Sequence, residues 1–114
     1  RVGDDRVLIV EPEDARTPPT KPHHSRQAIE RLKEEAGNQM TRANLQILRG
    51  GFGLRIKYRR AEVEYDAANI IGGIADALTR VVYRDDRRLR FVDYEERQEG
   101  GRDQYWVTVE PVRW

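Results

Sequence analysis

The sequence predicts a single α/β (α+β) domain, residues 1–114, in which helices pack on a mixed β-sheet. Segments with apolar residues at helical spacing alternate with short runs rich in β-branched and aromatic residues. The expected elements follow the order β-α-β-α-β-β, and helices that alternate with strands before a final hairpin suggest a mixed sheet with helices packed on it. A chain of 114 residues has room for one hydrophobic core.

The first half of the chain contains one expected strand and one expected helix. Val7 to Val10 is a short aliphatic run that a proline ends, so we expect a strand there. Residues 13–24 hold three prolines, which is typical of a loop. A helix is expected from the N-cap Ser25 to the Gly37-Asn38 pair. The following segment, Met40 to Leu48, fits either a second helical piece or irregular structure.

A second strand is expected from Leu54 to Arg60, after a turn at Gly50, Gly51 and Gly53. Apolar residues alternate with cations in it, the pattern of a strand with one buried face. The apolar residues are Leu54, Ile56 and Tyr58, and the cations are Arg55, Lys57 and Arg59.

The second half continues with a helix and two strands. The helix is expected from Ala67 to Thr79, because four aliphatic residues form one stripe along it. The strands Arg90–Tyr94 and Tyr105–Val109 are expected to form a hairpin through Gly100 and Gly101. The helical stripe is Ile70, Ile71, Ile74 and Leu78, and the expected core residues of the two strands are Phe91, Val92, Trp106, Val107 and Val109.

The balance of charge gives no general signal for nucleic-acid binding. The net charge is +1, from 21 basic and 20 acidic residues, so a DNA-binding face would require charges that are segregated in space. The absence of cysteine excludes disulfides and cysteine-ligated zinc, and it fits a reducing compartment. No apolar run approaches the roughly 20 residues of a membrane span.

The segment from Tyr65 to Asp86 carries the chemistry. Asp66 stands at the start of the expected helix and Asn69 follows three residues later. Asp76-Ala77-Leu78 occupies the last turns, and the pair Asp85-Asp86 comes after the helix. Carboxylates from different elements are the ligands that hold Mg²⁺, and Mg²⁺ can activate water and neutralise a leaving oxygen in phosphodiester hydrolysis.

This segment resembles the catalytic segment of the RusA-type Holliday junction resolvases. Their pattern runs Asp-x-Asp-Asn, a lysine three residues on, Asp-Ala-Leu and then an Asp-Asp pair. Most of it is present here, and the coarse order of elements is also similar. Two positions depart from it: Ala68 stands where the family has its second metal-binding aspartate, and Gly72 where it has the lysine.

The resemblance implies a metal-dependent endonuclease of bacterial or phage origin, located in the cytoplasm, that cuts four-way DNA junctions. It implies Asp66 and Asp86 as catalytic residues that ligate Mg²⁺, with Asp85 in support and Mn²⁺ as a substitute ion. Asn69 and Asp76 would support the motif, and Ala68 marks the missing ligand. A homodimer is expected, because two symmetric cuts match a two-fold protein.

The spacing of the acids sets a geometric condition. A helix from Ala67 to Thr79 is about 20 Å long, so Asp66 and Asp86 begin at opposite ends of it. The chain must fold back along the helix, or a second chain must contribute, before the two acids can meet. The sequence does not force either arrangement.

Several alternatives stay open. Ala68 is either a natural loss or an engineered change, and without that ligand the chain could be a non-catalytic protein that binds branched DNA. A third hypothesis is an interaction protein with no DNA role, which the balanced charge permits. Asp66 and Asn69 could simply cap a helix, Asp85-Asp86 could form a turn, and His23 and His24 could be solvated loop residues.

DNA phosphates are expected to contact cations near the motif and on the second strand. A solvated strand face, or neutralisation of neighbouring acids, is the plainer role for the same residues. Tyr105, Trp106 and Trp114 are expected in the core or at an interface rather than stacked on bases. The candidate DNA-binding residues are Lys57, Arg59, Arg60, Arg87 and Arg88.

Overall fold

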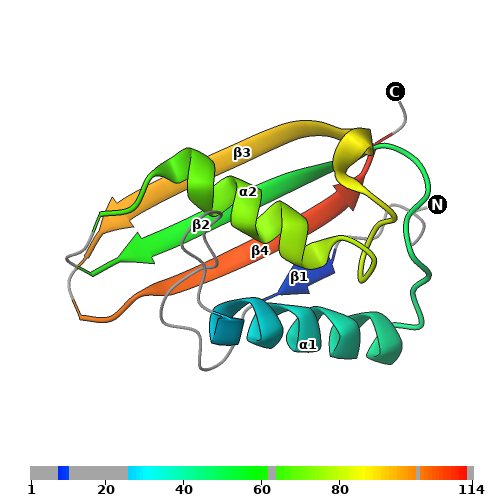
Figure 1. Ribbon diagram of the computed structural model, residues 1–114, viewed down its shortest axis with the longest axis horizontal. Helices are drawn as coiled ribbons and strands as arrows, with labels where there is room; N and C mark the ends of the chain where they lie inside the picture. The colour runs from blue at the N-terminus through cyan, green and yellow to red at the C-terminus, as the bar shows by residue number, and fades with distance from the viewer. Residues whose placement is uncertain (1–7, 11–25, 62–63, 100, 113–114) are drawn as a thin grey trace.

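The computed structural model describes residues 8–10, 26–61, 64–99 and 101–112. The described part of the chain forms a mixed sheet with two α-helices (Figure 1). The predicted class, an α/β domain with helices packed on a mixed sheet, is therefore found. The elements are β1 (Leu8–Val10), α1 (Arg26–Arg42), β2 (Phe52–Arg60), α2 (Ala67–Leu78), the 3₁₀ helix η2 (Asp86–Arg88), β3 (Leu89–Gln98) and β4 (Gln104–Pro111).

The sheet has the strand order β1-β4-β2-β3. β2 pairs in parallel with β3 and antiparallel with β4, so it separates the last two strands. The predicted hairpin between those strands is therefore wrong. α2 provides the crossover that a parallel pair needs, and β4 then occupies the other side of β2. β3 is left as one edge of the described sheet.

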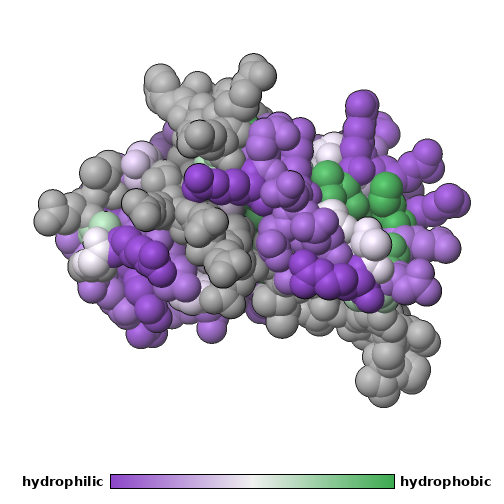
Figure 2. Space-filling view, turned by 90° about the horizontal axis from the view of Figure 1, so that it is seen from below, coloured by the Kyte–Doolittle hydropathy of each residue, from purple (hydrophilic) through white to green (hydrophobic). Residues whose placement is uncertain are grey.

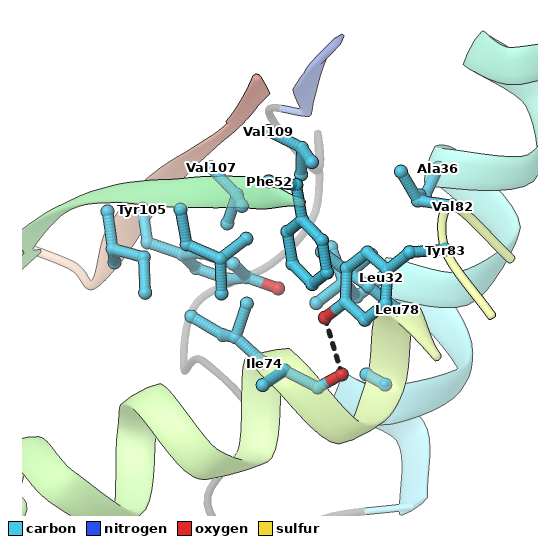
Figure 3. Packing of buried hydrophobic residues seen from close by; sticks show 14 of the residues in the cluster. Leu32, Ala36, Phe52, Ile74, Leu78, Val82, Tyr83, Tyr105, Val107 and Val109 are labelled. Carbon is cyan, nitrogen blue, oxygen red and sulfur yellow. Dashed lines mark hydrogen bonds between the residues drawn. The ribbon is translucent and has the colours of Figure 1, made fainter. Parts of the chain in front are cut away.

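Both helices lie on one face of the sheet, and the core fills the space between (Figures 1 and 3). The predicted alternation along β2 is confirmed, because its apolar residues are buried and its cations Arg55, Lys57 and Arg59 are exposed on the opposite face. The α2 stripe is also found, with Ile71 only half-buried. The core includes Leu32, Ala36, Met40, Phe52, Leu54, Ile56, Ile70, Ile74, Leu78, Val82, Tyr83, Tyr105, Val107 and Val109.

Helix α1 runs further than the sequence predicts. Gly37 and Asn38 lie inside it, and the helix ends only at Arg42. Leu32, Ala36 and Met40 repeat every four residues and are all buried, so one further buried turn outweighs the local stop signal. The expected N-cap Ser25, the strand residue Val7 and the loop at 13–24 lie outside the described residues.

Three expectations about residues of the sheet are also wrong. Gly53 belongs to β2 rather than to the turn, and a Cβ built on it would lie 2.0 Å from the Phe91 ring, so only glycine leaves room for that ring. Phe91 is half-buried, and Val92 is 38% exposed because α2 does not cover that part of the edge strand. Trp106 of β4 is half-buried rather than core, and it pairs in register with Lys57 of β2 on the face without helices.

Candidate functional site

Asp66 begins α2 and acts as its N-cap. Its backbone is extended, and its carboxylate accepts a hydrogen bond from the Ala68 N–H at 2.9 Å. The Asp66 carbonyl accepts from the N–H groups of Asn69 and Ile70, at 3.0 and 3.1 Å. An aspartate at this position accepts hydrogen bonds from free N–H groups, and its negative charge interacts favourably with the positive end of the helix dipole. Capping is thus the role of Asp66 within a single chain.

Asp85 is the N-cap of η2, beyond the far end of α2. Its carboxylate accepts hydrogen bonds from the Arg87 N–H at 2.9 Å and from the Arg87 guanidinium at 3.3 and 3.4 Å. These bonds and the charge of Arg87 hold the pKa of the Asp85 carboxyl below its ordinary value. Asp86 follows as the first residue of η2 and is exposed.

Tyr83 fixes the path of the chain between α2 and η2. Its ring stacks on Phe52 with centroids 4.0 Å apart, and its hydroxyl donates to the Ala75 carbonyl at 2.6 Å (Figure 3). The pKa of Tyr83 is raised, first by burial and then by the charges of Asp86 and Asp76. Asp76 lies in the last turn of α2 and Asp86 follows in η2, whereas Asp66 lies at the other end of the helix.

The structure does not bring the predicted metal ligands together within one chain. The twelve residues of α2 span about 18 Å, and the segment that carries Asp85 and Asp86 stays at the far end of that length (Figure 1). Among the described residues, no three His, Cys, Asp or Glu side chains are placed to hold a metal ion. Within the described part of one chain, the acids at the two ends of α2 therefore do not form one cluster.

The cations of β2 are mostly neutralised on their own surface. Arg55 forms ion pairs with Glu110 at 2.7 Å and with Asp93 at 2.9 Å, and Arg59 pairs with Glu99 at 2.8 Å. The guanidinium of Arg59 also lies over the Trp106 ring, 5.3 Å from its centroid, so Trp106 makes a cation–π contact with Arg59. The face without helices is a mosaic of both charges and not a basic patch.

Arg60 lies on the helix side of the sheet in a small polar network. It pairs with Glu96 at 2.7 Å, and the two side chains are only 13% and 21% exposed. The Tyr94 hydroxyl donates to the second oxygen of Glu96 at 2.7 Å. This network joins β2 to β3 and gives Arg60 a structural role. Tyr94 and Glu96 were not singled out from the sequence, although their spacing of two residues places them on one face of a strand.

Lys57 and Arg88 are the two candidate DNA-binding residues for which the described residues provide no ion pair. Lys57 borders a shallow hollow of about 530 Å³ that Arg55, Arg59, Trp106 and Thr108 also line. Arg88 is exposed in η2 beside Arg87, whose guanidinium is held by Asp85. The two cations lie on different elements, so they do not form one continuous basic surface. His23, His24 and Trp114 lie outside the described residues.

No protein-family model matches this sequence, and none of the curated proteins searched matches it. In the part of the chain that the structure describes, no helix is long and apolar enough to cross a membrane. The described residues on the face seen in Figure 2 are mostly hydrophilic.

Proposed function

We propose that this chain is a RusA-type nuclease protein that binds four-way DNA junctions and depends on Mg²⁺ or Mn²⁺ for cleavage. The observation that carries the proposal is the motif and its place on the fold. Asp66 begins α2, Asp76-Ala77-Leu78 forms its last turn, and Asp85-Asp86 precedes the edge strand β3. Resemblance to the family supports the assignment of cleavage, DNA binding and metal dependence.

The separation of the acids adds a condition to this proposal. One chain holds Asp66 and Asp86 at opposite ends of α2, so neither acid has the other as a partner. A second copy related by two-fold symmetry can bring the N-terminal end of one α2 to the C-terminal end of the other. The homodimer is therefore part of the proposal, and it also matches the symmetry of a junction that is cut twice.

Ala68 is the position where a single substitution tests the function. It lies in the first turn of α2 and is exposed, so an aspartate there meets no buried neighbour. A carboxylate in the first turn also interacts favourably with the positive end of the helix dipole. Ala68→Asp should therefore leave the fold intact while it restores the acid that the family pattern contains.

The test is cleavage of a labelled four-way junction with Mg²⁺ or Mn²⁺, by the chain as it stands and by Ala68→Asp. Paired symmetric nicks from Ala68→Asp, and few or none from the unchanged chain, would support the proposal. An Ala68→Asp, Asp86→Asn double variant is the matched control and should not cut. If Ala68→Asp folds and dimerises but neither binds nor cuts the junction, the proposal is refuted.

A second candidate is a protein on the same fold that binds branched DNA without cutting it. Ala68 favours this candidate, because loss of one carboxylate weakens capture of a divalent ion. Binding to a junction in preference to a linear duplex, with steep dependence on salt and no cleavage by either chain, would support it. Substitution of Lys57 or Arg88 should then weaken binding more than substitution of Arg60, which is held by Glu96.

A further inference from the structure

The edge of the sheet formed by β3 is long and unpaired within the described chain. β3 has ten residues, and its only strand neighbour among the described elements is β2. An open edge presents a row of free N–H and C=O groups, and proteins usually shorten, cover or pair such an edge. The ten residues contain neither proline nor glycine, so the backbone can pair along its full length.

The symmetry of a contact between two copies fixes the direction of pairing. When two identical strands pair through the same edge, the closed arrangement is two-fold symmetric, and the strands run antiparallel. The acids along β3 do not oppose this contact as a row of unpaired charges, because Glu95, Glu96 and Glu99 pair with Arg97, Arg60 and Arg59 of their own chain.

An exposed apolar residue marks the middle of the same edge. Val92 is 38% exposed, and it is one of the two large hydrophobic side chains that stand exposed in the described chain, with Ile47. It pairs in register with the buried Leu54 and therefore points to the helix side of the sheet. α2 leaves it uncovered. A second copy joined near Val92 would cover this side chain.

We infer that two copies of this chain join through antiparallel pairing of their β3 strands and form one continuous sheet. The consequence for the acids follows from the topology. α2 begins near the C-terminal end of β3, so Asp66, which is the N-cap of α2, lies at that end of the sheet (Figure 1). The antiparallel partner begins its own β3 there, directly after its Asp85 and Asp86.

Each Asp66 would then lie at the same end of the joint sheet as the partner's copies of Asp85 and Asp86. This inference rests on the proposed function only for the use of those acids; the interface itself does not depend on cleavage. Figure 1 shows that α2 begins near the C-terminal end of β3 and that η2 precedes the N-terminal end of β3. The pairing thus supplies the convergence that a single chain lacks.

Cross-linking tests the interface directly, because the chain contains no cysteine and one introduced thiol is the sole reporter. Val92→Cys in the full chain is treated with a short bis-maleimide, and Ile47→Cys is the matched control, since Ile47 is 42% exposed and lies outside the sheet. We expect a covalent dimer from Val92→Cys and little from Ile47→Cys. Equal cross-linking of both variants, or none of Val92→Cys, would overturn the inference.

Sedimentation provides the second measurement. The unchanged chain should be a dimer at micromolar concentration, and Val92→Lys should weaken the dimer at least about ten-fold, because it places a charge in a desolvated strand pair. Ile47→Lys should leave the dimer unchanged. A monomeric unchanged chain, or equal weakening by both variants, would also overturn the inference. Urea unfolding of each variant shows whether the fold has been kept.

Metal binding separates this inference from the proposed function. In the Ala68→Asp chain, Asp66→Asn and Asp86→Asn should each abolish Mn²⁺ binding measured by calorimetry. An equimolar mixture of the Asp66→Asn and Asp86→Asn chains should regain about a quarter of the sites. About half of the dimers then contain one chain of each kind, and each of these dimers has both intact acids at one of its two sites. If Val92→Cys cross-links as expected but none of the chains binds Mn²⁺, the metal function is refuted and the interface stands.

Discussion

Replacement of Tyr83 by phenylalanine tests how the last turn of α2 is closed. The Tyr83 hydroxyl donates to the Ala75 carbonyl at 2.6 Å, and Tyr83 is 1% exposed. This carbonyl is one of the last four of α2, which lack partners within a helix. The Thr79 hydroxyl, at 3.0 Å from the same oxygen, remains in the variant. The free energy of unfolding should therefore fall by about 1 kcal/mol, the net contribution of one hydrogen bond.

Tyr105→Phe is the matched control. Tyr105 is also 1% exposed, but its hydroxyl has no hydrogen-bond partner among the described residues. Removal of that hydroxyl should change the free energy of unfolding by less than about 0.5 kcal/mol, or raise it. Combining Thr79→Val with Tyr83→Phe removes both donors from the Ala75 carbonyl. The loss should then exceed the sum of the single losses by about 1 kcal/mol, because a buried acceptor is left unsatisfied.

The measurement is urea unfolding followed by far-UV circular dichroism, with equal slopes required of all variants. A loss of about 1 kcal/mol corresponds to a decrease of about 4 °C in Tm for a domain of this size. Equal losses from Tyr83→Phe and Tyr105→Phe would show that the hydroxyl of Tyr83 does not hold the helix end. Additive losses in the double variant would show that the two hydroxyls do not share one carbonyl.

Three further predictions follow from contacts elsewhere. Gly53→Ala should lower the free energy of unfolding by about 1–3 kcal/mol, because the new Cβ would meet the facing phenylalanine ring, whereas Gly50→Ala enters open space and should change it by less than about 0.5 kcal/mol in the same urea titration. Glu96→Gln should lower the free energy of unfolding by about 2 kcal/mol, because its ion pair with Arg60 lies between an exposed and a buried pair in exposure. A change near zero would show that this ion pair is not held in solution. The depressed pKa of Asp85 means that its ionised form favours the fold, so this contribution is present above the ordinary carboxyl pKa and is lost as pH falls through the lower folded value. An NMR titration should show Arg87→Ala returning the pKa of Asp85 toward its ordinary value, and an unchanged pKa would mean that Arg87 does not bind it.

Periodicity alone determined the parts of the fold that were predicted correctly. The alternation from Leu54 to Arg60 identified a strand, its buried face and its exposed cations, because side chains of a strand alternate by geometry. Local signals failed where packing competed with them. Gly37 and Asn38 favour a helix end, but burial of Met40 requires one more turn. Pairing of the last two strands was also wrong, because neighbours in sequence need not be neighbours in a sheet.

The candidate site was predictable residue by residue but not as a geometry. The position of Asp66 before an apolar stripe was sufficient to place it at the start of α2, and the structure has it there. Its distance from Asp86 depends on the path of the returning chain, which no spacing rule gives. The ion pair of Arg60 with Glu96 could not be predicted from the sequence either, since the two residues are 36 positions apart and meet only through the register of β2 and β3.

The strand order has a consequence for synthesis of the protein. β1 pairs with β4 and not with β2, so the first described strand has no place in the sheet until the last described strand exists. β2 also lacks its antiparallel neighbour until then. A ribosome-bound chain that ends before Gln104 can form at most the parallel pair β2-β3 with its crossover helix. Folding of this domain should therefore begin late in translation, and chains arrested before β4 should be the form that chaperones and proteases encounter.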